Sequence, residues 1–200
     1  SLSSSLKGET KEVYPAEIDE DDLASIIYTS GTTGQSKGVM LTHKNLVWTV
    51  EKSYKLQNIT ESDRFLSVLP LSHTFENTLG FLLPMRFGAS VHYLRKPPVA
   101  SVLLPAFQTV KPTIMLVVPL IIEKVFKAKI LPKFQKGVVM RSIYSLPVFR
   151  KILHKIAGRK LYETFGGHLK FFGVGGAKLC PKTERFLLEG KFPYAIGYGL

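Results

Sequence analysis

One segment constrains this 200-residue chain more than any other: residues 28–39 read YTSGTTGQSKGV. It follows an apolar run that predicts a strand over 23–29, so a loop is expected at the end of that strand. Its glycines let the backbone approach a ligand closely, and successive N–H groups in such a turn bind anions. Its hydroxyl groups add donors for phosphate oxygens, and Lys37 adds a mobile positive charge. Together these features predict a binding site for a triphosphate.

Two other interpretations of this loop are open. Clusters of Gly, Ser and Thr are usually ordinary surface turns, and composition alone favours that interpretation. A Walker A loop would need a glycine at position 36, where this chain has Ser36, so a P-loop kinase or ATPase is disfavoured. The order of the residues and the preceding strand favour phosphate binding of another type.

The segment resembles the phosphate-binding signature of the adenylate-forming (AMP-binding) superfamily, which includes acyl-CoA synthetases, firefly luciferases and the adenylation domains of peptide synthetases. Ser36 stands where proline is usual in that signature, which changes the stiffness of the loop more than its chemistry. The resemblance implies that the loop holds the β- and γ-phosphates of ATP. The residues that it assigns to this role are Thr29, Ser30, Gly31, Thr32, Thr33, Gly34 and Lys37, and Lys37 is also a catalytic candidate.

A second motif lies at residues 69–76, which read LPLSHTFE. In the family this motif places an aromatic or His side chain beside the acyl substrate and its reacting carboxylate, so the resemblance implies a catalytic role for His73. The alternative is a His at the start of a helix with a satisfied hydrogen bond. Some long-chain synthetases carry a Trp gate four residues further on, but Asn77 stands there, which argues against a gate of that type.

A third motif lies at residues 172–177, which read FGVGGA, and the chain ends on Tyr198, Gly199 and Leu200. The first of these resembles the family segment that lines the adenine and acyl pockets, which implies binding by Gly175, Gly176 and Ala177. The end resembles the start of a Tyr-Gly-x-Thr-Glu motif, whose Tyr packs on adenine, which adds Tyr198 and Gly199. A dinucleotide fingerprint would need a glycine where Lys178 stands. An ordinary strand-to-helix turn is the alternative for the third motif.

Residues 156–172 resemble long-chain fatty acyl-CoA synthetases, in which a basic helical segment precedes the Gly-Gly-Ala strand. The family reaction joins a carboxylate to the α-phosphate of ATP, releases pyrophosphate, and then transfers the acyl group to coenzyme A. The implied small molecules are a fatty acid, ATP and coenzyme A. No cluster of His, Cys and carboxylates has metal-ligand spacing, so no protein metal site is assigned and Mg²⁺ is expected to arrive with ATP. A fatty acyl-AMP ligase, or an enzyme for a different acid, is the alternative.

Short apolar runs alternate with longer periodic ones along the chain. A strand followed by a helix, repeated about five times, predicts an α/β fold with a largely parallel, doubly wound sheet flanked by helices. Ligands bind beyond the carboxyl ends of the strands in such sheets. Strands are predicted over 23–29, 64–69, 90–94, 113–118, 169–174 and 194–198, and helices over 42–56 with Thr42 as its cap, 75–87, 102–110, 119–130, 141–165 and 181–189.

The resemblance also divides the chain into regions. Residues 1–20, rich in Ser, Glu and Lys, are expected to form a flexible lead-in, and residues 21–200 the incomplete core of a large AMP-binding N-terminal domain. The family's Thr-Glu pair after Tyr198-Gly199, and its C-terminal lid domain with a catalytic Lys, do not occur in this sequence. We therefore expect the isolated chain to be catalytically silent.

Charge is distributed unevenly along the chain. The net charge is +12, and residues 111–170 carry 13 Lys or Arg against two Glu. Such a block favours polyanions, although a solvated basic face explains it equally well. Residues 141–165 combine a basic face with an apolar stripe at Phe149, Ile152, Leu153, Ile156 and Leu161. A helix that packs this stripe on the core and leaves its basic face solvated is the favoured interpretation, and peripheral contact with an anionic membrane is the alternative.

Composition also bears on nucleic-acid binding and on the redox state of the compartment. A nucleic-acid-binding module is a non-enzymatic alternative, but the chain has no recognised motif for it and its basic residues avoid the Gly-rich loop, so no nucleic acid is expected. The single cysteine, Cys180, excludes an internal disulfide and fits a reducing compartment. The expected location is the cytoplasm, and peripheral membrane contact through 141–165 is the alternative interpretation of that segment.

Overall fold

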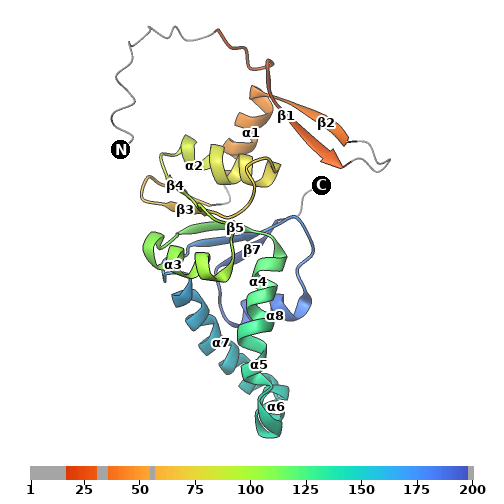
Figure 1. Ribbon diagram of the computed structural model, residues 1–200, viewed down its shortest axis with the longest axis vertical. Coiled ribbons are helices and arrows are strands. Elements are labelled where there is room, and N and C mark those ends of the chain that lie inside the picture. Colours follow the sequence, from red (N-terminus) through yellow and green to blue (C-terminus); the bar gives the residue numbers. More distant parts are fainter. Residues whose placement is uncertain (1–16, 31–35, 55–56, 198–200) are drawn as a thin grey trace. The chain divides into compact units, whose positions relative to one another are not determined.

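The computed structural model describes residues 17–30, 36–54 and 57–197 (Figure 1). The chain divides between Val47 and Trp48 into two compact units. The smaller unit holds the Gly-rich motif and the larger unit holds the other two motifs, so each is described by itself.

The smaller unit is built on an antiparallel hairpin. Strand β1, Leu23–Ser30, pairs with strand β2, Ser36–Thr42, and the register places Ser30 opposite Ser36. The predicted strand over 23–29 is confirmed, but β1 is not a strand of the parallel sheet, and β2 was missed. Residues 36–38 were expected to belong to the loop, because Ser, Lys and Gly carry no strand signal. These residues form a strand because they pair with β1 through cross-strand hydrogen bonds, although most of β2 is exposed.

Helix α1, His43–Tyr54, begins in the smaller unit and ends in the larger one. Its start is fixed by a reciprocal pair of hydrogen bonds. The Asn45 N–H donates to the Thr42 hydroxyl (3.3 Å), and the Thr42 N–H donates to the Asn45 side-chain oxygen (3.0 Å). The predicted cap at Thr42 is therefore confirmed, because its side chain satisfies an N–H group that has no partner within the helix.

The larger unit contains a five-stranded sheet in which every pair of neighbours is parallel, in the order β4-β3-β5-β6-β7. The strands are β3 (Arg64–Ser67), β4 (Ser90–Tyr93), β5 (Ile114–Val117), β6 (Phe171–Val174) and β7 (Tyr194–Ile196). The predicted parallel α/β sheet is confirmed. All carboxyl ends of its strands therefore lie at one edge and all amino ends at the other.

Helices cover both faces of this sheet (Figure 1). Neighbouring residues of a strand point to opposite faces, so Met115 joins a core cluster with helices on one face and Ile114 joins a second cluster on the other. The first face is covered by α3 (Ala100–Val110), α4 (Pro119–Val125), α7 (Pro147–Thr164) and α8 (Pro181–Glu189). The second is covered by the end of α1, the π-helix η2 (Glu76–Leu82) and α2 (Leu83–Arg86). The sheet is therefore doubly wound, as predicted.

The winding changes side between β3 and β5. The connection from β3 to β4 runs through η2 and α2 on one face, whereas the later connections run through helices on the other face. Such a switch point leaves a crevice beyond the carboxyl ends of the two central strands, where ligands of doubly wound sheets bind. A ligand-binding site is therefore expected in the segments that follow β3, β5 and β6.

Three predicted helices differ from the structure. The apolar run 75–87 starts as the π-helix η2 and continues as α2. The helix predicted over 119–130 continues beyond α4 as a π-helix, η3 (Phe126–Ile130), and as α5 (Leu131–Phe134). The helix predicted over 141–165 is two helices, α6 (Gly137–Ser145) and α7, because Leu146 precedes Pro147 and adopts an extended conformation.

Helix α7 packs closely on the residues that end α8. A Cβ atom added to Gly158 would lie 2.5 Å from the Gly190 carbonyl oxygen, so both backbones meet where only glycine fits. Glu189 strengthens the contact, because its carboxylate accepts a hydrogen bond from Arg150 (3.0 Å) and lies 2.7 Å from the Nδ1 atom of the buried His154. Both helices are thus held together by a polar cluster and by close backbone approach.

Asp63 organises the amino edge of the sheet. Its fully buried carboxylate accepts hydrogen bonds from the Thr113 hydroxyl and the Lys170 ammonium group (2.8 Å each), and from the Thr60 N–H (2.9 Å). Burial alone would raise the pKa of Asp63, but the hydrogen bonds from Lys170, Thr60 and Thr113 outweigh it and lower that pKa. One charged group thus joins the segments that lead into β3, β5 and β6.

Candidate functional site

The hairpin of the smaller unit presents the ends of the Gly-rich loop. Thr29 lies opposite Lys37 in the β1–β2 register, and the Thr29 hydroxyl donates a long hydrogen bond (3.5 Å) to the Lys37 carbonyl oxygen. Paired residues of antiparallel strands project to the same face, so the structure brings these two predicted phosphate-binding residues together. Gly31, Thr32, Thr33 and Gly34 lie outside the described residues, as does the side chain of Ser30.

His73 lies in the larger unit, on the turn that leads from β3 into η2. Its side chain is exposed, and its Nδ1 atom accepts a hydrogen bond from the Phe75 N–H (3.3 Å). Because Nδ1 is an acceptor in this bond, the neutral ring carries its proton on Nε2. The alternative for His73, a hydrogen bond at the start of a helix, is therefore present at Nδ1. The Nε2–H group can still donate to a ligand.

Gly175, Gly176 and Ala177 follow the carboxyl end of β6. The Gly175 N–H donates to the carbonyl oxygen of Val117 (3.0 Å), the last residue of the neighbouring strand β5. Gly176 has a φ of +81°, a left-handed conformation that side chains disfavour, and both Gly176 and Ala177 are exposed. This turn offers a ligand bare backbone and one methyl group.

Phe75 joins the second and third motifs. A Cβ atom added to Gly175 would lie 3.0 Å from the Phe75 ring, and one added to Gly197 would lie 4.0 Å from it. The turn that carries His73, the Gly175 turn and the end of β7 therefore lie side by side at the carboxyl edge. Tyr198 and Gly199 lie outside the described residues. The glycine at 175 has a packing reason, since any side chain there would meet the aromatic ring.

Glu76 was missed by sequence analysis. Its side chain is only 1% exposed, within the π-helix that follows β3. Its carboxyl oxygen Oε2 is buried and has no hydrogen-bond partner among the described residues. Burial raises the pKa of Glu76, and the influence of the nearby Ser67 hydroxyl opposes this only in part. The signal in the sequence is that Glu76 is the one acid within the largely apolar run 75–83.

The Glu76 carboxyl group affects its surroundings in two ways. Burial, together with the charge of Glu76, raises the pKa of Tyr93, which ends strand β4. A Cβ atom at Gly80, one turn along η2, would lie 2.6 Å from the Glu76 carboxyl carbon. The carboxyl group therefore lies against helix backbone, in space that exists because residue 80 has no side chain.

Two further properties bear on function. Over the described ranges, no group of three or more His, Cys, Asp or Glu side chains is arranged to hold a metal ion. Within those same ranges, no helix has the length and apolar content needed to cross a bilayer.

Comparison with known proteins agrees with this arrangement. The AMP-binding enzyme family matches residues 2–200. Long chain acyl-CoA synthetase 8 of Arabidopsis thaliana is 29% identical over 223 residues, covering 96% of this chain and 30% of that protein. Long-chain-fatty-acid–CoA ligase 1 of Schizosaccharomyces pombe is 31% identical, covering 94% of this chain and 30% of that protein. The chain thus spans about a third of the length of these relatives.

Solved structures show the same fold. MatB from Rhodopseudomonas palustris superimposes with a TM-score of 0.69 at 21% identity, covering 94% of this chain and 31% of that chain. The adenylation domain of a carboxylate reductase from Mycobacterium chelonae gives a TM-score of 0.69 at 26% identity, covering 93% of this chain and 28% of that chain. By sequence and by fold, the chain belongs to the AMP-binding enzyme family.

Proposed function

We propose that the full-length protein containing this chain is an AMP-forming acid–CoA ligase that activates a long-chain fatty acid. The observation that carries the proposal is the meeting of the His73 turn and the Gly175 turn at the switch point of a doubly wound sheet. Long-chain fatty acid–CoA ligases among the relatives support the choice of acid and of thiol acceptor.

The proposed reaction has two steps. A carboxylate oxygen of the acid attacks the α-phosphorus of ATP, so that a C–O–P bond forms and the bond to the β-phosphate breaks, releasing pyrophosphate. The thiolate of coenzyme A then attacks the acyl carbon, and AMP leaves. Positioning and neutralisation of charge carry most of the catalysis in such phosphoryl-centre chemistry.

Named groups of this chain have separate parts in that reaction. Thr29 and Lys37 supply a hydroxyl and a positive charge to the departing phosphates. The His73 Nε2–H donates to the acyl oxygen and so holds the acid in line with the α-phosphate. The exposed Gly176–Ala177 backbone provides a flat surface for the adenine. Mg²⁺ is part of the substrate in this proposal, as the counter-ion that ATP carries.

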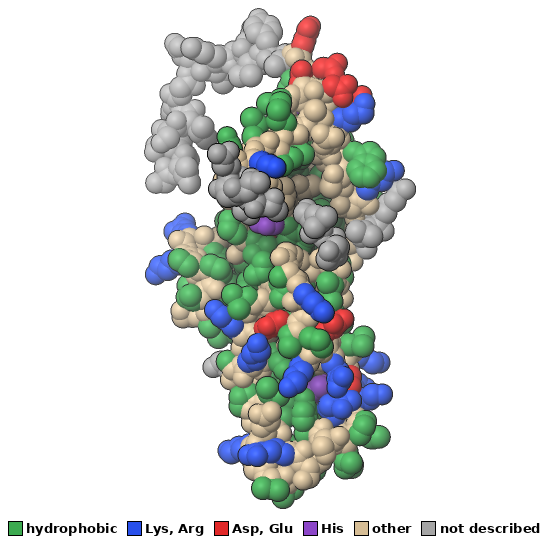
Figure 2. Space-filling model, turned by 90° about the vertical axis from the view of Figure 1, so that its right-hand side faces the viewer, with side chains coloured by type: hydrophobic (Ala, Val, Ile, Leu, Met, Phe, Trp, Pro, Cys, Tyr) green, Lys and Arg blue, Asp and Glu red, His purple; other side chains and the backbone are tan. Residues whose placement is uncertain are grey.

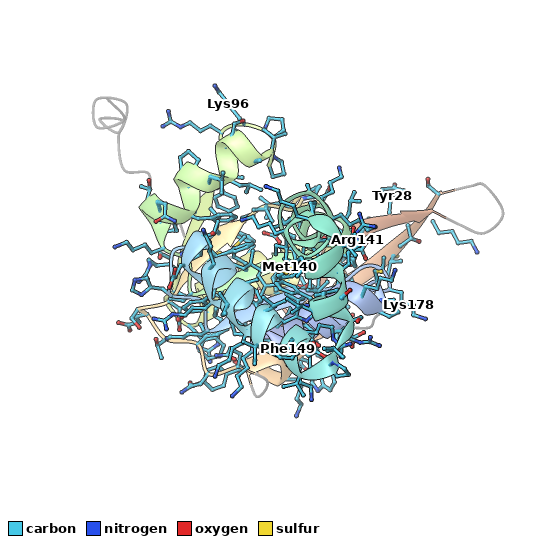
Figure 3. The ribbon with its side chains drawn as sticks, turned by 90° about the horizontal axis from the view of Figure 1, so that it is seen from below. Tyr28, Lys96, Met140, Arg141, Phe149 and Lys178 are labelled. Atoms are coloured by element: carbon cyan, nitrogen blue, oxygen red, sulfur yellow. The ribbon has the colours of Figure 1, made fainter. Side chains whose placement is uncertain are left out.

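Pyrophosphate release by the full-length protein tests the proposal. We expect release to need ATP and a long-chain acid, and acyl-CoA to form when coenzyme A is added. Lys37→Ala is expected to lower kcat/KM on the order of 100-fold and His73→Ala on the order of tenfold or more. Lys96→Ala serves as the matched control, because Lys96 is exposed and belongs to none of the three motifs (Figure 3).

Other outcomes of this assay identify the alternatives. Acyl-AMP that accumulates and never reacts with coenzyme A would identify a fatty acyl-AMP ligase, and activity with a different acid would replace the fatty acid. No release with any acid would refute the proposal. We also propose that residues 1–200 alone form no acyl-CoA, and measurable product from this segment would contradict that.

We propose in addition that helices α6 and α7 rest on an anionic membrane, at the cytoplasmic side where its substrate partitions. Part of the apolar stripe predicted to face the core is instead exposed, since Phe149, Ile152 and Ile156 are half exposed or more. Figure 2 shows Lys and Arg side chains interspersed with apolar ones in this region, and Figure 3 shows Met140, Arg141 and Phe149 together on it. The exposed apolar side chains are Val138, Val139, Leu146, Val148, Phe149, Ile152 and Ile156.

Co-sedimentation with liposomes tests this surface. Arg150 is unsuitable for charge reversal because it pairs with Glu189, whereas Lys151 and Lys155 are exposed. We expect Lys151→Glu/Lys155→Glu to reduce binding to vesicles rich in phosphatidylserine by about tenfold, and Arg95→Glu/Lys96→Glu, as the control, to leave it unchanged. Equal binding by both variants, or equal binding to neutral vesicles, would refute membrane contact through this surface.

A further inference from the structure

The Gly175 turn, which runs from Gly175 to Cys180, is bonded at both ends to one neighbouring segment. At its start, the Gly175 N–H donates to the Val117 carbonyl oxygen (3.0 Å) at the end of β5. At its end, the Cys180 N–H donates to the carboxylate oxygen Oε1 of Glu123 (2.8 Å) on helix α4. Because α4 begins shortly after β5, one short stretch of chain holds both ends of the turn.

The bond from Glu123 supplies a cap that α8 does not provide for itself. Cys180 is the N-cap residue of α8, and its own side chain makes no capping hydrogen bond. In a capping box, a Glu or Gln at the third helical position accepts the N–H of the cap residue. Thr183 stands at that position, and its buried hydroxyl has no hydrogen-bond partner among the described residues. The carboxylate that accepts the Cys180 N–H therefore comes from a different helix.

Glu123 is itself held in place by the helix that carries it. Its side chain is only 16% exposed, and the neighbouring Ile122 is fully buried in the core. The ring of Phe126, directly after α4, packs on the ring of Phe186 in α8, with centroids 5.0 Å apart. The second carboxylate oxygen, Oε2, lies 3.4 Å from the ammonium group of the exposed Lys127. Glu123 is therefore a fixed acceptor and not a mobile surface group.

Between its two ends, the Gly175 turn exposes its backbone. Gly176, Ala177 and Lys178 are all exposed, and Gly176 has the left-handed conformation that glycine favours. A Cβ atom added to Gly176 would lie 3.6 Å from the Val118 side chain, so this backbone lies over the segment that joins β5 to α4. Leu179, next to the end of the turn, is buried. The location of the exposed backbone is therefore set by the bonds and the packing at its ends.

We propose that Glu123 is a positioning residue, which fixes the end of the Gly175 turn through the Cys180 N–H and thereby holds the Gly176–Ala177 backbone where it receives the adenine of ATP. This rests on the proposed function only in naming adenine as the group that the turn receives. The task of Glu123 is to accept one hydrogen bond, which an amide of the same length can also do. The bond therefore depends on the reach of the side chain more than on its charge.

Kinetics of the full-length enzyme separate positioning from mere stabilisation. Glu123→Ala, which has no acceptor, and Glu123→Asp, which is shorter by one methylene group, are expected to raise KM for ATP on the order of tenfold, with kcat changed by no more than about twofold. Glu123→Gln is expected to stay within about twofold of the wild type, because its amide oxygen accepts the same bond. Lys127→Ala is the matched control, since it removes the ion pair of Glu123 and leaves the bond to Cys180.

Two kinetic results would overturn the proposal. A Glu123→Ala enzyme that melts at a lower temperature but keeps its KM for ATP describes a structural residue only. A Glu123→Gln enzyme as impaired as Glu123→Ala would show that the charge, and not the hydrogen bond to Cys180, is what matters. If Glu123→Ala does not fold, Glu123→Asp decides the question, because it keeps the charge and most of the volume and loses only the reach.

Amide hydrogen exchange of the full-length protein gives a readout that does not need the proposed reaction. We expect the exchange rate of residues 175–180 to rise on the order of tenfold in Glu123→Ala and Glu123→Asp and to stay at the wild-type value in Glu123→Gln, with strand β3 unchanged in all three. Unchanged exchange of residues 175–180 in Glu123→Ala, or an equal rise in β3, would refute the positioning role. Loss of pyrophosphate release with every acid, alongside the expected exchange, would refute only the reaction.

Discussion

The two edges of the central sheet each bury one carboxyl group, and they treat it in opposite ways. Asp63, at the amino edge, has hydrogen-bond donors from Thr60, Thr113 and Lys170, and its pKa is lowered. Glu76, at the carboxyl edge, has one buried oxygen without a hydrogen-bond partner among the described residues, and its pKa is raised by burial. Chemically similar groups therefore have opposite charge preferences within one unit.

The difference follows from the number of donors around each carboxyl group. A buried carboxylate is stable when several donors and a cation surround it, and it takes up a proton when they do not. At the amino edge, the bonds to Asp63 thus hold three strands together. The carboxyl edge, where doubly wound sheets bind ligands, leaves hydrogen-bonding capacity unused and exposes backbone at Gly176.

The largest effect on stability is expected from removal of the Asp63 carboxylate. Asp63→Ala should lower the free energy of unfolding by about 3 kcal/mol, because it leaves the buried Thr113 hydroxyl and a cation without their acceptor. The lowered pKa means that this stabilisation is present above the ordinary Asp pKa and disappears as pH falls through the folded-state value. Urea denaturation at several pH values measures both. A loss that is independent of pH would contradict the role of the charge.

Gly80→Ala is expected to have the next largest effect, at the opposite edge. The new Cβ atom would lie 2.6 Å from the Glu76 carboxyl group, which is enclosed and cannot turn away, so we expect destabilisation of about 2 kcal/mol. In a Glu76→Ala background the same change should be neutral or stabilising, since alanine favours helix by about 1 kcal/mol over glycine. Equal destabilisation in both backgrounds would show that the carboxyl group is not what occupies this space.

Glu76→Gln should stabilise the protein at pH 8 by about 1 kcal/mol. The raised pKa means that the folded protein disfavours ionisation, so the wild type loses stability as pH rises from the ordinary value of 4.5 through the folded-state value. The neutral amide removes this loss, and the difference between the two proteins should vanish at acid pH. Thermal melting between pH 4 and about 8 checks this, and a difference that grows on acidification would reverse the interpretation.

Lys170→Met is expected to have the smallest effect. The ammonium group is about half exposed, so its ion pair with Asp63 contributes about 0.5 kcal/mol and less at high salt. Measuring unfolding in low and high salt isolates this contribution. A loss as large as that of Asp63→Ala would mean that the cation, and not the threonine donors, keeps Asp63 charged.

Much of the fold could be predicted from the sequence, because apolar runs such as 113–118 have one structural solution when they are buried on both faces. The cap at Thr42 and the two-sided core follow from the same local rules. The break between α6 and α7 was also present in the sequence, at Pro147, but the apolar periodicity across it hid the signal. The strand β2 carried no such signal, since its pairing with β1 is set by tertiary contacts.

The site was predictable only in part. The motifs identified His73 and Gly175, and the structure brings their turns together through Phe75. The burial of Glu76 depends on a π-helix and on a missing side chain at Gly80, and no one-dimensional pattern encodes that combination. Gly31, Thr32, Thr33, Gly34, Tyr198 and Gly199 lie outside the described residues, and their assignments stay predictions.

The contact between Gly158 and Gly190 has a consequence for how this protein can change over evolutionary time. A side chain at either position would meet backbone atoms of the other segment, so neither glycine can be replaced first and compensated later. The outer face of α7 is under no such constraint, because side chains there, such as those of Ile152 and Ile156, are exposed. Substitutions can therefore accumulate on that face and alter what it touches, while the helix itself stays in place.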